Sequence, residues 1–178
     1  ACFMDMQQDL RFICGNVDAS LRYAEGKHIS FVAFNGLALF GGFGILRNLS
    51  VETTGGYVYV MMIMIMLVIS AALIASIYSF IPIIVKDLDN GDPAACTNVL
   101  FFEHIKRHSV DSYAKLLCEG YLADEKEISP LDRCIMAQII VNARLASRKF
   151  ALFKWVAFFD LAAVILGLAG FLPAAVFG

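Results

Sequence analysis

YVYVMMIMIMLVISAALIASIYSFIPIIV, residues 57–85, contains no charged side chain. A helix needs about 20 apolar residues to cross the hydrocarbon core of a bilayer, so this stretch is long enough to span it. Two further runs, 29–46 and 150–177, are also long and predominantly apolar. The sequence therefore predicts an all-α integral membrane protein with three transmembrane helices. Hydrophobic residues make up 60% of the chain, above the roughly 45–50% of soluble domains, which agrees with this class.

The basic residues predict how the chain crosses the membrane. Nine of the 14 Lys and Arg residues lie in 86–149, and only Arg47 lies in the loop 47–56. Because cytoplasmic loops are enriched in Lys and Arg, we expect 1–28 and 86–149 to be cytoplasmic. The loop 47–56 and the C-terminus are then external. No small-residue cleavage site follows a short apolar run, so we expect no cleaved signal peptide.

The flanks of the apolar runs carry helix signals. Residues 4–27 read as helical with a break at Gly15-Asn16, after which Asp18 is placed to cap the next helix. Ser129-Pro130-Leu131-Asp132 has a capping hydroxyl, a proline at the first helical position and a carboxylate three residues after the cap. We expect this helix to run without interruption to Gly170 or Pro173, so that it joins the cytoplasmic region to the third span.

The region 86–149 is predicted to be a small helical cytoplasmic module, continuous with spans one and three. Within it, Ser109–Leu122 has apolar residues at steps of three and four, which indicates an amphipathic helix. Its predicted buried face is Val110, Tyr113, Ala114, Leu117 and Tyr121. In span one, Ala38 and Gly42 are four residues apart, a spacing of small residues that lets helices approach closely in lipid.

Catalysis has little support in this sequence, so we expect no enzyme. There is no glycine-rich phosphate loop, no GxSxG and no HExxH. His104 and His108 are four residues apart, but no cysteine completes a metal-ligand set, and we expect no metal site. The net charge of −2 gives no sign of a nucleic-acid partner, and none is expected.

Asp160 is the one acidic residue within a predicted span. A charge at the centre of a bilayer costs several kcal/mol unless it is paired or neutralised, so such a residue has either a functional or a structural reason. In the functional interpretation Asp160 faces a pore or a subunit interface. In the structural one it is a protonated acid hydrogen-bonded to Asn35 of span one, or it is reached by Lys154 of a neighbouring copy. Both interpretations stay open from the sequence.

Basic and aromatic residues on the predicted cytoplasmic side form a candidate site for a small anion. Guanidinium groups hold phosphates and aromatic rings stack on bases. The alternative is that such cations only anchor the ends of the spans. Arg22 and Arg144 are favoured as ligands because they lie further from the bilayer. The candidate ligand-binding residues are Arg22, Lys27, Phe102, Arg107, Tyr113 and Arg144.

Several short motifs occur in a fixed order: Ala24-Glu25-Gly26-Lys27, Asn35-Gly36, Leu100-Phe101-Phe102, Tyr113, Gln138-Ile139, Asn142-Ala143 and Lys149-Phe150. Together they resemble the transmembrane effector family of Pycsar, the bacterial pyrimidine-cyclase anti-phage system. The resemblance runs from about Ala24 to Phe171. The family's first motif is usually Ala-Asp-x-Lys, and Glu25 stands at its acidic position here.

The resemblance implies a location in the bacterial inner membrane and a defence function. A partner cyclase would make cyclic CMP or cyclic UMP on infection, and the effector would sense it on the cytoplasmic side. It would then disrupt the inner membrane and cause abortive infection. The alternatives are a ligand-independent scaffold or accessory subunit, and a small oligomeric channel that uses Asp160. Because three spans per chain enclose little of a path, we expect a homo-oligomer.

Overall fold

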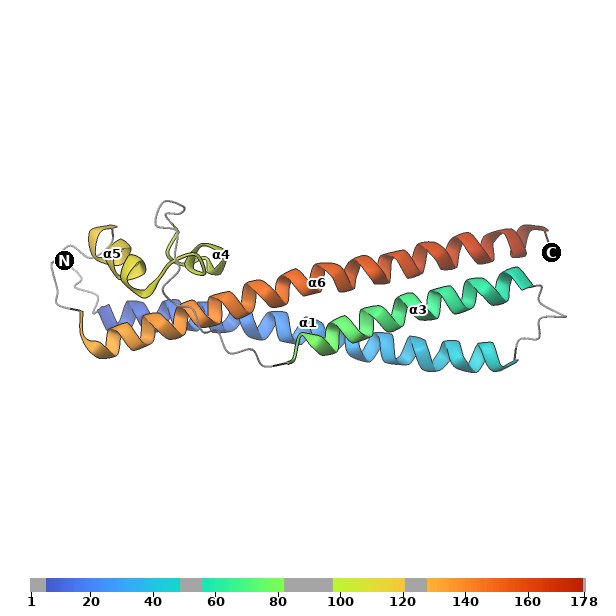
Figure 1. Cartoon of the computed structure of the whole chain (residues 1–178), viewed down its shortest axis with the longest axis horizontal. Helices are drawn as coiled ribbons and strands as arrows, with labels where there is room; N and C mark the ends of the chain where they lie inside the picture. Colours follow the sequence, from blue (N-terminus) through green and yellow to red (C-terminus); the bar gives the residue numbers. More distant parts are fainter. Residues whose placement is uncertain (1–5, 49–55, 82–97, 121–127, 178) are drawn as a thin grey trace. The chain divides into compact units, whose positions relative to one another are not determined.

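The computed structural model describes residues 6–48, 56–81, 98–120 and 128–177. Five helices lie in these ranges (Figure 1): α1 (Met6–Asn48), α3 (Gly56–Tyr78), α4 (Phe102–Ile105), α5 (Val110–Gly120) and α6 (Pro130–Phe177). No strand occurs in the described part of the chain. Helices α1, α3 and α6 are each long and apolar enough to cross a membrane. The prediction of an all-α protein with three membrane-spanning helices is confirmed.

The chain divides into two compact units. The first comprises Ala1–Ala24 and Pro82–Phe150, and the second comprises Glu25–Ile81 and Ala151–Gly178. Helices α1 and α6 therefore contribute residues to both units, whereas α4 and α5 belong to the first and α3 to the second.

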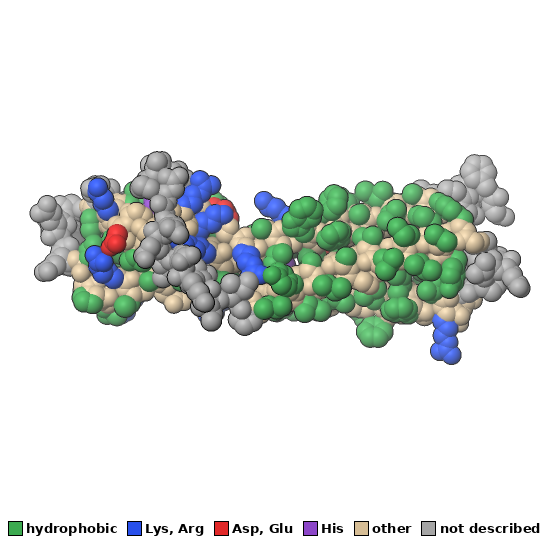
Figure 2. All heavy atoms as spheres, viewed as in Figure 1, with side chains coloured by type: hydrophobic (Ala, Val, Ile, Leu, Met, Phe, Trp, Pro, Cys, Tyr) green, Lys and Arg blue, Asp and Glu red, His purple; other side chains and the backbone are tan. Residues whose placement is uncertain are grey.

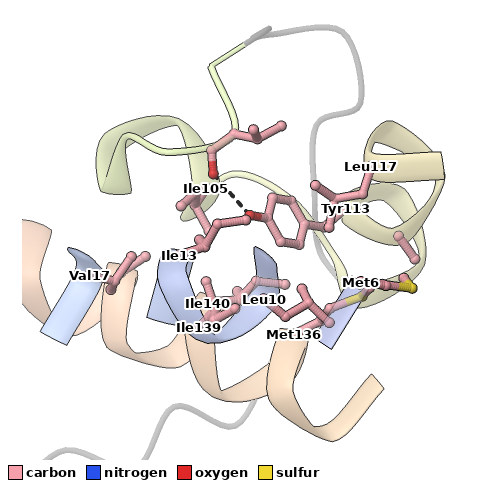
Figure 3. Close-up of a cluster of buried hydrophobic side chains, with 13 residues drawn as sticks. Met6, Leu10, Ile13, Val17, Ile105, Tyr113, Leu117, Met136, Ile139 and Ile140 are labelled. Atoms are coloured by element: carbon pink, nitrogen blue, oxygen red, sulfur yellow. Dashed lines mark hydrogen bonds between the residues drawn. The ribbon is translucent and has the colours of Figure 1, made fainter. Parts of the chain in front are cut away.

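The first unit is built around a hydrophobic core that gathers side chains from four helices (Figure 3). The predicted apolar face of the 109–122 helix is largely confirmed, since α5 buries Tyr113, Ala114 and Leu117 in this core and Val110 packs against it. Tyr121 lies outside the described residues. The other buried members are Met6, Leu10, Ile13 and Val17 of α1, Val99, Ile105 of α4, and Met136, Ile139, Ile140 and Ala143 of α6.

The predicted break at Gly15-Asn16 is wrong, because α1 continues through both residues. Both face outward, and apart from the adjacent residues and the local helix backbone no described atom lies within 4 Å of a Cβ placed on Gly15. Glycine inside a helix costs about 1 kcal/mol relative to alanine. Ile13 and Val17 on either side are only 3% and 1% exposed, and burying two such side chains outweighs that cost. Tertiary packing thus overrides the local stop signal.

Asp18 does not cap a helix, which corrects a second expectation. It lies inside α1, and its Oδ1 accepts a hydrogen bond of 2.6 Å from Nδ2 of Asn142 on α6. A polar side chain within a helix is free to pair with a neighbouring helix when its own helix needs no cap. This hydrogen bond joins α1 to α6 within the first unit.

The predicted start of the last long helix is confirmed. The Ser129 hydroxyl accepts from the Asp132 backbone N–H at 3.2 Å, and Asp132 Oδ2 accepts from the Ser129 backbone N–H at 3.1 Å. This reciprocal pairing is a capping box, which satisfies two backbone donors at the helix start. At its other end α6 passes Gly170 and Pro173 and finishes at Phe177, so the predicted stop is several residues too early.

The second unit contains the apolar lengths of α1, α3 and α6, and hydrophobic side chains cover the face of it seen in Figure 2. Leu37 and Phe40 are 74% and 81% exposed. A bilayer supplies the apolar environment that such a surface needs. At the α1–α3 contact, a Cβ added to Gly42 would collide with Sδ of Met66. The small residue predicted to permit close approach is therefore at a close helix–helix contact.

Candidate functional site

Arg144 holds the segment between α4 and α5 against α6. Its Nε donates to the backbone carbonyl of Lys106 at 3.1 Å, and one terminal nitrogen donates to the carbonyl of His108 at 3.4 Å. Lys106 itself donates from Nζ to the Ser147 hydroxyl at 2.6 Å and pairs with Glu103. The Arg144 guanidinium therefore fixes the backbone carbonyls of Lys106 and His108, which lie on either side of the exposed Arg107 in the chain.

An aromatic row lies along α4 in the same unit. The rings of Phe102 and Phe150 stack with centroids 5.2 Å apart and an interplanar angle of 19°. Phe101 lies 5.0 Å from Phe102, and His104 contacts Phe101 edge-on at 5.4 Å. Phe101 is 44% exposed, so part of its surface is open to a planar ligand. Stacked aromatic rings next to cations are a suitable arrangement for a nucleobase with a phosphate.

Tyr113 lies within the hydrophobic core. It is completely buried, and its hydroxyl donates to the carbonyl of Val99 at 2.9 Å. Burial raises the pKa of Tyr113, because the charged phenolate would lose its hydration. In this structure Tyr113 orders α5 and the chain before α4. A ligand contact by Tyr113 stays a prediction.

The structure does not bring all the predicted ligand residues together. Phe102 and Arg144 belong to the cluster on α4 and α6, with Arg107 next to it in the chain. Arg22 is exposed on the part of α1 that belongs to the first unit. Lys27 belongs to the second unit, where its ammonium lies 4.6 Å from the centroid of the Phe153 ring. Lys27 is thus in a cation–π contact in a different unit.

A polar network in the first unit was not predicted, although Gln138, Asn142 and Asp18 were named in the sequence for other reasons. Nε2 of Gln138 donates to Oδ1 of Asn142 at 2.9 Å, and Asn142 donates to Asp18. Cys14 lies nearby, and its pKa is raised by burial and by the negative charge of Asp18. The available signal was the four-residue spacing of Gln138 and Asn142 beside the buried Ile139 and Ala143. Polar residues on a core-facing stretch of helix need partners.

In the second unit the structure joins the two polar residues of the spans. Nδ2 of Asn35 on α1 donates to Oδ2 of Asp160 on α6 at 3.5 Å, and Asn35 has no exposed surface. This is the contact that the structural interpretation of Asp160 predicted. Among the described residues, no group of three or more His, Cys, Asp or Glu side chains is placed to hold a metal ion.

Comparison with protein families gives a match over nearly the whole chain. The family described as the Pycsar effector protein domain matches residues 9–176, and so takes in both units and all three candidate membrane spans. The chain belongs to this family. The resemblance carried by the motifs is therefore confirmed, and the chain is a membrane effector of Pycsar anti-phage defence. Searches of curated proteins and of solved structures gave no match.

Membership defines the setting in which this Pycsar effector works. The family implies two partners for the effector, which are a signal made by a cyclase and the membrane. It is a family of effectors and not a known enzyme class.

Proposed function

We propose that the first unit of this Pycsar effector binds cyclic CMP or cyclic UMP on the cytoplasmic side, and that binding makes the effector disrupt the inner membrane and causes abortive infection. The observation that carries the proposal is the family match together with the aromatic and basic cluster of α4 and α6. A cyclic pyrimidine mononucleotide offers one planar ring and one anionic phosphate, and this cluster offers a partner for each.

We assign the ligand contacts to basic and aromatic side chains of the first unit that remain accessible to a ligand. Arg144 and Lys106 already have backbone and side-chain partners, so their role is to order the segment that carries Arg107. Arg107 and Arg22 are exposed, and we propose that their guanidinium groups hold the phosphate. Phe101 is 44% exposed and lies against Phe102, and we propose that the pyrimidine stacks on this aromatic pair. Each step uses a residue of the first unit.

The effect on the membrane needs two arrangements of the effector. A ligand shifts the population only as far as its affinities for the two arrangements differ. Helices α1 and α6 each contribute residues to both units, so their continuous backbone connects the first unit to the spans. We also propose a homo-oligomer, because three spans enclose little of a path by themselves. The Lys and Arg residues of 1–28 and 86–149 support an orientation with cytoplasmic N-termini and external C-termini.

We expect purified full-length effector in lipid nanodiscs to bind cyclic CMP or cyclic UMP, as measured by titration calorimetry. Arg107→Gln and Arg22→Gln are each expected to weaken binding about tenfold or more, because a hydrogen bond to a charged group contributes about 1.5–3 kcal/mol. Arg11→Gln is the matched control, since Arg11 is also an exposed arginine of α1. No binding of either nucleotide would contradict the proposed function. Equal weakening by all three variants would contradict the assigned contacts.

A further inference from the structure

The contact between Asn35 and Asp160 leaves two oxygens unpaired. One hydrogen bond joins the residues, from Nδ2 of Asn35 to Oδ2 of Asp160. The other oxygen of each group, Oδ1 of Asn35 and Oδ1 of Asp160, is buried and has no hydrogen-bond partner among the described residues. Both groups lie within apolar lengths of helix, where water does not supply the missing partners.

The two protonation states of Asp160 predict different outcomes for these oxygens. An ionised carboxylate only accepts hydrogen bonds, and the amide oxygen of Asn35 also only accepts. Neither can therefore satisfy the other. A neutral carboxylic acid has one O–H donor, which can be given to Oδ1 of Asn35. A single proton thus pairs both orphaned oxygens, and the acid and the amide close a ring of two hydrogen bonds.

The surroundings of Asp160 favour the neutral acid. Asn35 donates the hydrogen bond that the carboxyl accepts, and among the residues that the structure describes no basic side chain forms an ion pair with Asp160. A buried carboxylate without a cation loses its hydration and gains no ion pair in exchange. Lys154, the nearest basic residue on α6, is exposed.

We propose that Asp160 is held as a neutral acid in the resting effector and forms with Asn35 a proton-dependent latch between α1 and α6 of the second unit. Separating the helices leaves both polar groups unpaired in hydrocarbon, so the latch resists separation. Loss of the proton removes one of the two hydrogen bonds and introduces a charge, which favours an open arrangement. This inference stands independently of nucleotide binding.

Asp160→Asn tests the latch, because an amide at position 160 makes both hydrogen bonds to Asn35 without a proton. We expect Asp160→Asn to keep the thermal unfolding midpoint of the wild type in detergent micelles. We expect Asp160→Ala to lower it, because Asn35 then has no partner. A midpoint for Asp160→Asn as low as that of Asp160→Ala would overturn the proposal, since it would mean that the negative charge is what stabilises the bundle.

Infrared spectroscopy of the full-length effector at neutral pH reads the proton directly. We expect the C=O stretch of a protonated carboxyl in the wild type, its loss in Asp160→Asn and its shift in Asn35→Leu, where the hydrogen bonds of the acid change. Asp111→Asn is the control, because Asp111 is an exposed carboxylate paired with Arg133 and is expected to leave the band unchanged. Absence of the band in the wild type, or its persistence in Asp160→Asn, would overturn the proposal.

Discussion

Ile140→Ala is expected to destabilise the first unit by about 2–5 kcal/mol, the range for truncating a large aliphatic side chain in a packed core. Ile140 has no exposed surface and lies in the core cluster shown in Figure 3. The deletion removes contacts to the surrounding side chains and leaves a cavity. Hydrogen exchange of the full-length effector in micelles measures the effect, and we expect faster exchange of the α5 amides, since α5 packs on this cluster.

Leu131→Ala provides the control on the same helix. Leu131 is 57% exposed, so its truncation is expected to change stability by no more than about 0.5 kcal/mol. If Ile140→Ala and Leu131→Ala had the same small effect on the α5 amides, the proposed core of the first unit would be wrong.

Gly42→Leu is expected to disrupt the contact between α1 and α3 in the second unit. Even a Cβ at this position meets the Met66 sulfur, so a leucine displaces the Met66 side chain or separates the helices. Overpacking of this kind costs typically about 1–3 kcal/mol. The expected result is a lower thermal unfolding midpoint in detergent micelles.

Gly41→Leu separates this packing effect from the general consequences of adding a leucine. Gly41 is the neighbouring residue, it is exposed, and no atom lies within 4 Å of a Cβ placed there. Both variants add the same apolar side chain and remove one glycine from the helix. We expect Gly41→Leu to keep or raise the unfolding midpoint. An equal fall for both variants would refute the close α1–α3 contact.

The features that could be predicted from the sequence are those with strong local causes. An uncharged apolar run of the length of 57–85 has few alternatives to a membrane span, and α3 follows from it. The helix ends at Tyr78, however, and residues 79–81 of the predicted span are not helical. The start of α6 was predictable because the cap uses residues that are adjacent in sequence, Ser129 and Asp132. The pairing of Asn35 with Asp160 was predictable as one form of the structural interpretation, beside a contact with Lys154 of a neighbouring copy, because polar groups in hydrocarbon have few possible partners.

The features that could not be predicted depend on contacts between distant residues. The sequence around Gly15 does not show that Ile13 and Val17 are buried in a core. It is this burial that keeps α1 helical through Gly15. A tyrosine suits both base stacking and core packing, so the sequence could not decide between these roles for Tyr113. Contacts with distant residues bury it in the core. Arg144 likewise meets two backbone carbonyls that are more than 30 residues away in sequence.

The central claim is that a cyclic pyrimidine mononucleotide makes this effector permeabilise a bilayer. The most direct measurement is dye release from sealed liposomes that contain the full-length effector, with nucleotide supplied on the side that carries the first unit. We predict release with cyclic CMP or cyclic UMP, and none with the linear monophosphates or with liposomes lacking the effector. Retention of the dye with both cyclic pyrimidine nucleotides, in liposomes shown to contain inserted effector, would contradict the account.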